Sequence, residues 1–178
     1  MIRRPFAAHP RAFTTASRPL VTERPDTPFA GSKEGMSARD TLTVPATMAG
    51  VRQAADTASA WTDRLGLPVE VRRRALTTLD EVLSNIVRHG VRGGAGVIQM
   101  TLAYEAGVLE IELTDDADSF NPLLVPAPDV GAAIEDRVPG GLGIVLVRAL
   151  ADEVRYERRA DRNTVTMRFD AHRGTRGV

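Results

Sequence analysis

The stretch LDEVLSNIVRHG, residues 79–90, decides the fold of this chain. Its apolar residues recur at helical spacing, which predicts an amphipathic helix with one face packed against a core. Glu81 and Asn85 are four residues apart, so their side chains leave the same face of that helix. The Glu81 carboxylate can polarise a hydroxyl group, and Asn85 offers an oxygen to a bound cation. Taken alone, such a polar stripe is more often the solvated side of a helix.

The composition narrows the class of protein. The chain has 178 residues, 43% hydrophobic and 26% charged, which suits one globular domain. Its 23 basic and 23 acidic residues balance, so no charge pattern marks a nucleic-acid or membrane surface. It has no cysteine, its three histidines are far apart, and no apolar run reaches the roughly 20 residues of a membrane span. We expect a soluble, cytoplasmic protein.

The pattern along the chain predicts one domain between two irregular ends. Residues 1–39 contain five prolines and no sustained period, which predicts a disordered tail, and residues 171–178 are expected to fray. The domain is expected over residues 40–170. Its predicted elements are a strand (40–44), a helix capped by Thr47 that runs to about Leu65, a helix that Pro68 opens, a hairpin (97–104 and 108–114), a helix (144–152) and a second hairpin (154–159 and 164–169). This order predicts the α/β class, as a two-layer α+β sandwich with a mixed, largely antiparallel sheet covered by helices on one face.

Two further clusters carry possible chemistry. TDDADSFNP, residues 114–122, follows a predicted strand, where an ionised carboxylate can accept a hydrogen bond from an exocyclic amine. GGLG, residues 140–143, precedes a predicted helix, whose unpaired amides favour an anion such as phosphate. Each has an ordinary alternative, an acidic turn in the first case and a common glycine turn in the second. The connection between them is long enough to be a lid or binding loop.

In this order, the three motifs resemble the Bergerat-fold ATPases of the gyrase, MutL and histidine-kinase superfamily. Within that superfamily the chain looks like the small anti-sigma-factor serine/threonine kinases. The phrases DEVLSN (80–85) and LVRALADEV (146–154) are close to the wording usual in that family. The resemblance covers residues 40–169 and implies a Bergerat-type sheet and a histidine-kinase-like ATPase domain.

The resemblance implies roles for the helix of residues 79–90. Asn85 would coordinate a Mg²⁺ ion that bridges the nucleotide phosphates. Glu81 would act as the general base on a target serine or threonine hydroxyl. Arg88 falls where the family places a basic phosphate contact, and it also fits an ordinary surface arginine. His89 is better explained by capping or packing than by catalysis.

The other two motifs would complete the nucleotide site. Asp115 would receive the adenine amino group. Gly141 and Gly143 would let a lid of about residues 123–139 fold over the triphosphate. The family often has a threonine near the adenine on the last strand, here Thr164 or Thr166.

One departure from the family pattern concerns the adenine motif. The family's Asp-x-Gly-x-Gly reads here as DDADS, residues 115–119, with Ala117 and Ser119 in place of the glycines. Both are small, but a left-handed backbone at either position would be costly. The departure bears on adenine affinity more than on phosphate geometry.

The resemblance implies an ATP- and Mg²⁺-dependent serine/threonine kinase that acts as an anti-sigma factor. Such a protein would bind a sigma factor, phosphorylate an anti-anti-sigma partner and form a homodimer, without contacting nucleic acid or membrane directly. The missing glycines leave open a second function, a protein-binding module that keeps the ATPase fold with nucleotide structural or absent. A third is the detached ATP-binding half of a histidine-kinase system.

Overall fold

The computed structural model describes residues 36–90, 96–119, 121, 124 and 142–173. Residues 1–35 of the tail expected at residues 1–39 lie outside the described residues. Gly141 and nearly all of the expected lid also fall outside them. Residues 38 and 39, assigned to the tail from the sequence, are instead the first two residues of a strand. The five strands are β1 (Ala38–Pro45), β2 (Val97–Glu105), β3 (Val108–Asp115), β4 (Glu153–Arg159) and β5 (Arg162–Asp170).

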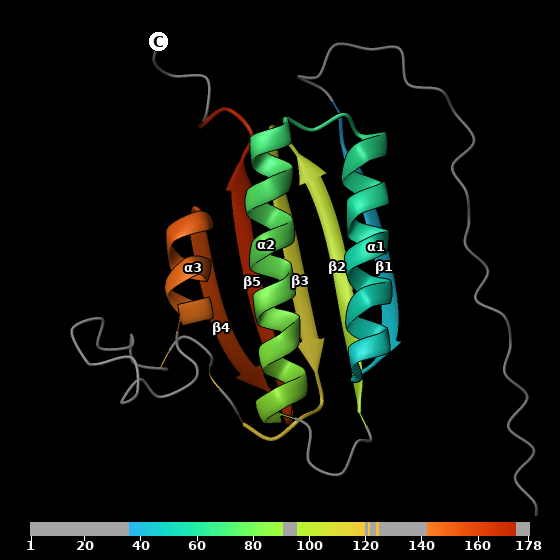
Figure 1. Cartoon of the computed structure of the whole chain (residues 1–178), viewed down its shortest axis with the longest axis vertical. Helices are drawn as coiled ribbons and strands as arrows, with labels where there is room; N and C mark the ends of the chain where they lie inside the picture. The colour runs from blue at the N-terminus through green and yellow to red at the C-terminus, as the bar shows by residue number, and fades with distance from the viewer. Residues whose placement is uncertain (1–35, 91–95, 120, 122–123, 125–141, 174–178) are drawn as a thin grey trace, which may run out of the picture. The chain divides into compact units, whose positions relative to one another are not determined.

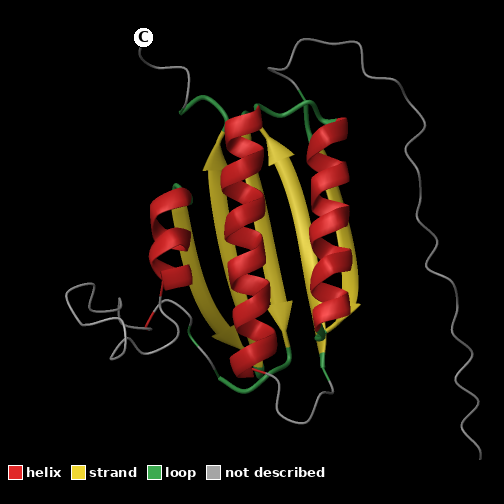
Figure 2. Cartoon of the chain, in the orientation of Figure 1, coloured by secondary structure: helices red, strands yellow, loops and turns green. Residues whose placement is uncertain are grey.

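The strands form one sheet in the order β1-β2-β3-β5-β4. Every pairing among the described strands is antiparallel, so the sheet is simpler than the mixed one expected. The helices α1 (Met48–Arg64), α2 (Val69–Asn85) and α3 (Leu142–Leu150) all lie over one face of it (Figure 1). In Figure 2 the helices lie in front of the sheet. The predicted two-layer α+β sandwich is confirmed.

Both predicted hairpins are present and close with two-residue turns. Ala106 and Gly107 have φ angles of 49° and 82°, and Ala160 and Asp161 have 47° and 62°. Two successive positive φ angles are the signature of a type I′ turn, whose twist matches that of the flanking strands. The second turn is tighter than the sequence suggested, because β5 already begins at Arg162.

The helix boundaries follow from local chemistry. Thr47 caps α1 through a hydrogen bond from the Gly50 amide to its Oγ1 (3.2 Å), and Gly66 has the positive φ that ends a helix. Pro68 precedes α2, as predicted. α3 ends at Leu150, two residues earlier than predicted, because the Asp152 amide instead donates to the Arg168 carbonyl (2.9 Å) of the neighbouring strand.

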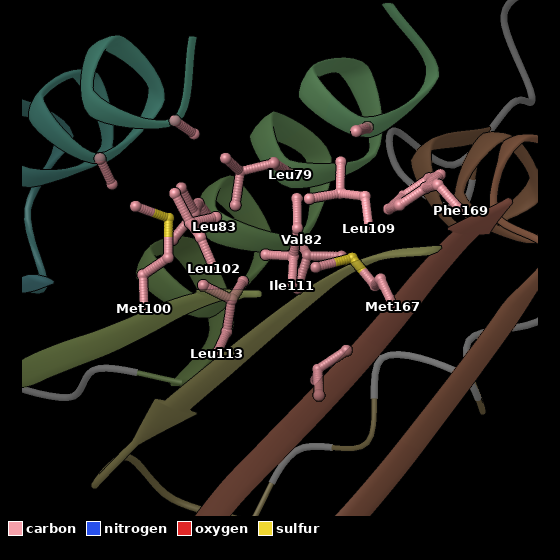
Figure 3. Packing of buried hydrophobic residues seen from close by; sticks show 14 of the residues in the cluster. Leu79, Val82, Leu83, Met100, Leu102, Leu109, Ile111, Leu113, Met167 and Phe169 are labelled. Atoms are coloured by element: carbon pink, nitrogen blue, oxygen red, sulfur yellow. The ribbon is translucent and has the colours of Figure 1, made fainter. Parts of the chain in front are cut away.

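The core lies between α2 and the three central strands (Figure 3). Leu79, Val82 and Leu83 are fully buried on the inner face of α2. Alternate residues of each strand point toward them, and burial of each large side chain contributes about 1.5–3 kcal/mol. The strand residues of this layer are Met100, Leu102, Leu109, Ile111, Leu113, Met167 and Phe169. The core therefore fixes how α2 lies on the sheet, and with it the polar residues of that helix.

A polar cluster joins α2 to the far end of α3. Arg74 donates to the Leu150 carbonyl (2.8 Å) and to Asp152 Oδ2 (2.7 Å), and its guanidinium lies 5.8 Å from the centre of the Phe169 ring. Asp152 also accepts hydrogen bonds from Arg173 and from the Asp170 amide. Burial alone would raise the pKa of Asp152, but these hydrogen bonds and the charge of Arg74 outweigh it, so the pKa lies below its ordinary value.

Asp152→Asn should lower the free energy of unfolding by about 1–3 kcal/mol near neutral pH, since it leaves Arg74 and the Asp170 amide, both partly buried, without their charged acceptor. The folded-state pKa of Asp152 is depressed. Its contribution is therefore present above the unfolded pKa of about 3.9 and is lost as the pH falls through the folded-state pKa. Urea unfolding should show the difference from the unmodified protein shrinking in acid. Asp161→Asn, at a fully exposed turn, is the control and should change stability little. A difference that does not depend on pH would contradict this account.

Candidate functional site

The predicted motifs come together at one end of the sandwich. α2 and β3 end there, and α3 and β5 begin there, at the lower end of the domain in Figure 1. Asn85 is the last residue of α2, Asp115 is the last of β3, and Gly143 is the second of α3. Three stretches that are distant in sequence thus supply the polar groups of one region.

Glu81 is in direct contact with the glycine turn. A Cβ atom built on Gly143 would overlap the Glu81 carboxylate, so the carboxylate lies against the backbone of the first turn of α3. Only a residue without a side chain permits this approach. The first turn of a helix carries unpaired amides and a partial positive charge, which attracts a carboxylate. The sequence predicted a glycine that makes room for a ligand. In the structure the group that lies against Gly143 is the Glu81 carboxylate.

Asn85 and Arg88 lie where the helix geometry changes. α2 passes after Asn85 into a π-helical turn, Ile86–Gly90, which the sequence pattern did not predict. Asn85 is half-buried, and Arg88 on the wider turn is exposed. Turns of this kind are rare and occur frequently at functional sites.

Asp115 provides a buried acceptor at the end of β3. It is 3% exposed, and its Oδ1 accepts from the Ala117 amide (3.0 Å) and from Asn163 Nδ2 (2.8 Å). Among the residues that the structure describes, none donates to Oδ2. The neighbouring Asp116 has a different partner. Its Oδ1 accepts a hydrogen bond from the Val97 amide (3.2 Å), which joins the turn to β2. The arrangement leaves the second oxygen of this carboxylate available to an N–H group of a ligand.

The last strand holds a residue that sequence reasoning missed. Asn163 is 3% exposed and faces the helices, whereas Thr164 and Thr166 lie on the open face of the sheet. Thr164 shares a hydrogen bond there with Thr114 (3.2 Å). Neither threonine therefore shares the face of the sheet that carries Asp115. The alternation of Val165, Met167 and Phe169 was the signal that could have identified Asn163.

The open face of the sheet carries a shallow hollow of about 250 Å³. Its glutamates outnumber its arginines, and Arg168 already pairs with Glu110 (2.7 Å). A surplus of carboxylates repels a triphosphate. The hollow is lined by Glu110, Glu112, Glu153, Arg155, Glu157, Thr166 and Arg168. The start of α3 beside Glu81, with its unpaired backbone amides, is the better candidate for an anionic ligand.

A comparison with protein families matches residues 44–169 to the histidine kinase-like ATPase domain. The chain belongs to this family. It is also similar to the serine/threonine-protein kinase BtrW of Bordetella bronchiseptica, with 28% identity over 112 residues, which are 60% of this chain and 79% of that protein. These findings confirm the resemblance drawn from the motifs.

Two solved structures are similar to the chain, and the first of them shares its fold. One holds the RsbU and RsbW domains of Rv1364c from Mycobacterium tuberculosis, with a TM-score of 0.54 and 19% identity over 74% of this chain. The chain spans only 31% of that one. Another is the histidine kinase domain of a blue-light-activated kinase from Erythrobacter litoralis, with a TM-score of 0.46 and 20% identity, covering 72% of this chain and 62% of that one.

No helix within the described ranges is long and apolar enough to cross a membrane. Nor do these residues contain a group of three or more histidine, aspartate or glutamate side chains placed to hold a metal ion.

Gly143→Ala should stabilise the fold by less than the roughly 1 kcal/mol usual for glycine to alanine within a helix, because the added Cβ must displace the Glu81 carboxylate, the far end of a flexible side chain. In a Glu81→Ala background, the same change should be more stabilising. Denaturant unfolding of the four proteins should give a coupling energy of about 0.5–1 kcal/mol. Strictly additive effects would show that the carboxylate does not lie against this turn.

Proposed function

We propose that the chain is an ATP-dependent serine/threonine protein kinase that acts as an anti-sigma factor. In this role it binds a sigma factor and phosphorylates an anti-anti-sigma partner. The observation that carries the proposal is the contact of the Glu81 carboxylate with the first turn of α3. Membership of the ATPase family and similarity to a serine/threonine kinase support the class of reaction.

The chain offers separate groups for the two ends of ATP. The free Oδ2 of Asp115 would accept a hydrogen bond from the adenine amino group. The backbone amide of Gly143, at the start of α3, would donate to a phosphate oxygen, as helix N-termini commonly do. Arg88, exposed on the π-helical turn, would add a positive charge near the phosphates.

The donor set at this end fits Mg²⁺. Magnesium bound with nucleotide phosphates keeps several waters and takes only one or two protein ligands. Asn85 would supply such an oxygen at the end of α2, one turn from Glu81. When bound, the ion would neutralise the charge that develops on the phosphates during transfer.

Glu81 would act on the protein substrate. A carboxylate within hydrogen-bond reach of a serine or threonine hydroxyl can accept its proton as that oxygen takes up the phosphoryl group. The contact with Gly143 holds this carboxylate beside the proposed phosphate site. Glu81 would therefore meet the hydroxyl at the point of transfer.

The identity of the partners rests on the family resemblance. A sigma factor and an anti-anti-sigma protein are the partners expected of anti-sigma-factor kinases. The homodimer and the cytoplasmic location remain predictions of the same kind.

The second candidate function is a binding module with structural or absent nucleotide. Ala117 and Ser119, in place of the family glycines, favour it. Against it stands the Glu81 contact, since a module that performs no chemistry has no need of a carboxylate at the phosphate turn. Calorimetry with Mg²⁺ and ATP, together with a turnover assay, separates the two. Tight binding without turnover would indicate the module.

Glu81→Gln should reduce phosphate transfer from radiolabelled ATP to candidate anti-anti-sigma proteins by about 10²- to 10⁴-fold, because the amide cannot accept a proton. ATP affinity should change by less than about threefold, since Glu81 does not bind the nucleotide in this scheme. Glu70→Gln, on the first turn of the same helix and paired with Arg73, is the matched control and should keep full activity. Undiminished transfer by Glu81→Gln would refute the assignment.

A further inference from the structure

Asn163 connects the Asp115 carboxylate to the turn that follows it. The two residues face each other across the β3–β5 ladder. Asn163 Nδ2 donates to Asp115 Oδ1 (2.8 Å), to the Asp118 carbonyl (3.0 Å) and to the Ala117 carbonyl (3.3 Å). A single buried amide group therefore holds both the carboxylate and the backbone of the turn.

The orientation of the Asn163 side-chain amide is fixed by the partners of its oxygen. Asn163 Oδ1 accepts from Arg158 Nη1 (2.7 Å) and from the Tyr156 hydroxyl (2.8 Å). A guanidinium can only donate, so the amide oxygen must face Arg158 and Nδ2 must face Asp115. Arg158 Nη1 also donates to the Ala117 carbonyl (3.2 Å), so a second side chain stabilises the turn.

This network determines which oxygen Asp115 presents to a ligand. Oδ1 is taken by the Ala117 amide and by Asn163, and these two donors fix the plane of the carboxylate. Oδ2 then points away from both. The turn itself lacks glycine at Ala117 and Ser119, and its conformation is instead held by hydrogen bonds from Asn163 and Arg158.

We infer that Asn163 is a positioning residue that makes the site select adenine over guanine. This rests on the proposed function, in which Asp115 receives the base. With Oδ1 occupied and the plane fixed, Oδ2 can only accept a hydrogen bond, as the adenine amino group requires. Guanine has a carbonyl oxygen at the equivalent ring position, which would face a buried carboxylate without a proton between them. Sites built around such a bond reject the analogue that lacks it.

The test is the ratio of ATP to GTP affinity of the full chain with Mg²⁺, measured by calorimetry. Asn163→Ala should weaken ATP binding about 10- to 100-fold and GTP binding much less, because the carboxylate loses its fixed orientation. Thr164→Ala is the matched control. It removes a hydrogen bond from the next residue of the same strand, on the opposite face, and should leave the ratio unchanged.

Asn163→Asp gives a readout that a purely structural role would not produce. It keeps the acceptor for Arg158 and Tyr156 but sets a second carboxyl group against Asp115, close also to the acidic residue Asp118. Two such groups share a proton only when the pH is low enough. ATP affinity of this variant should therefore improve about tenfold between about pH 8 and pH 6, while that of the unmodified chain stays within about twofold.

The outcomes separate the inference from the proposed function. If the unmodified chain binds neither nucleotide, both are overturned. If it prefers ATP, and Asp115→Asn loses that preference while Asn163→Ala keeps it, the inference alone is overturned. Thermal unfolding shows whether each variant is folded. If Asn163→Ala does not fold, Asn163→Asp and the milder Tyr156→Phe are used in its place. The inference is supported if Asn163→Ala loses the preference for ATP over GTP and the ATP affinity of Asn163→Asp recovers in acid.

Discussion

The seating of the Glu81 carboxylate against the backbone of Gly143 is the constraint on which the proposed site depends. It requires α2 and α3 to pack closely, which the buried face of α2 and the Arg74–Asp152 pair at the far end of α3 together enforce. It also requires a residue without a side chain at position 143. Because both helices are held in this way, a carboxylate from one meets the amides of the other at the end of the sheet where β3 places Asp115.

The two sides of the site use different physical means. On the side proposed for the phosphates, space is made by the absence of a side chain at Gly143. On the side proposed for the base, the turn after β3 has no glycine at Ala117 or Ser119, and hydrogen bonds from Asn163 and Arg158 hold its carbonyls in place. A buried polar network of this kind specifies one arrangement only if its members are satisfied, and Asn163 has partners for both its nitrogen and its oxygen.

Much of the fold could be predicted from the sequence, since the relevant signals are local. Apolar spacing identified α2, Thr47 and Gly66 marked the ends of α1, and alternation identified both hairpins. The pairing of β5 with β3 was harder, because it joins two strands that are distant in the sequence, and this pairing places Asn163 rather than a threonine beside Asp115. The π-helical turn after Asn85 has no simple sequence signal. The contact of Glu81 with Gly143 depends on the packing of two helices, which periodicity within either one does not contain.

The most direct test of the central claim is a nuclear magnetic resonance titration of the full chain with Mg²⁺ and a non-hydrolysable ATP analogue. The account predicts that backbone amides change together in three separate segments, at Glu81–Asn85, at Asp115–Ala117 and at Gly143, while Glu112 and Thr166 on the open face of the sheet stay unchanged. Changes confined to the open face, or to only one of the three segments, would contradict the claim that they form one nucleotide site.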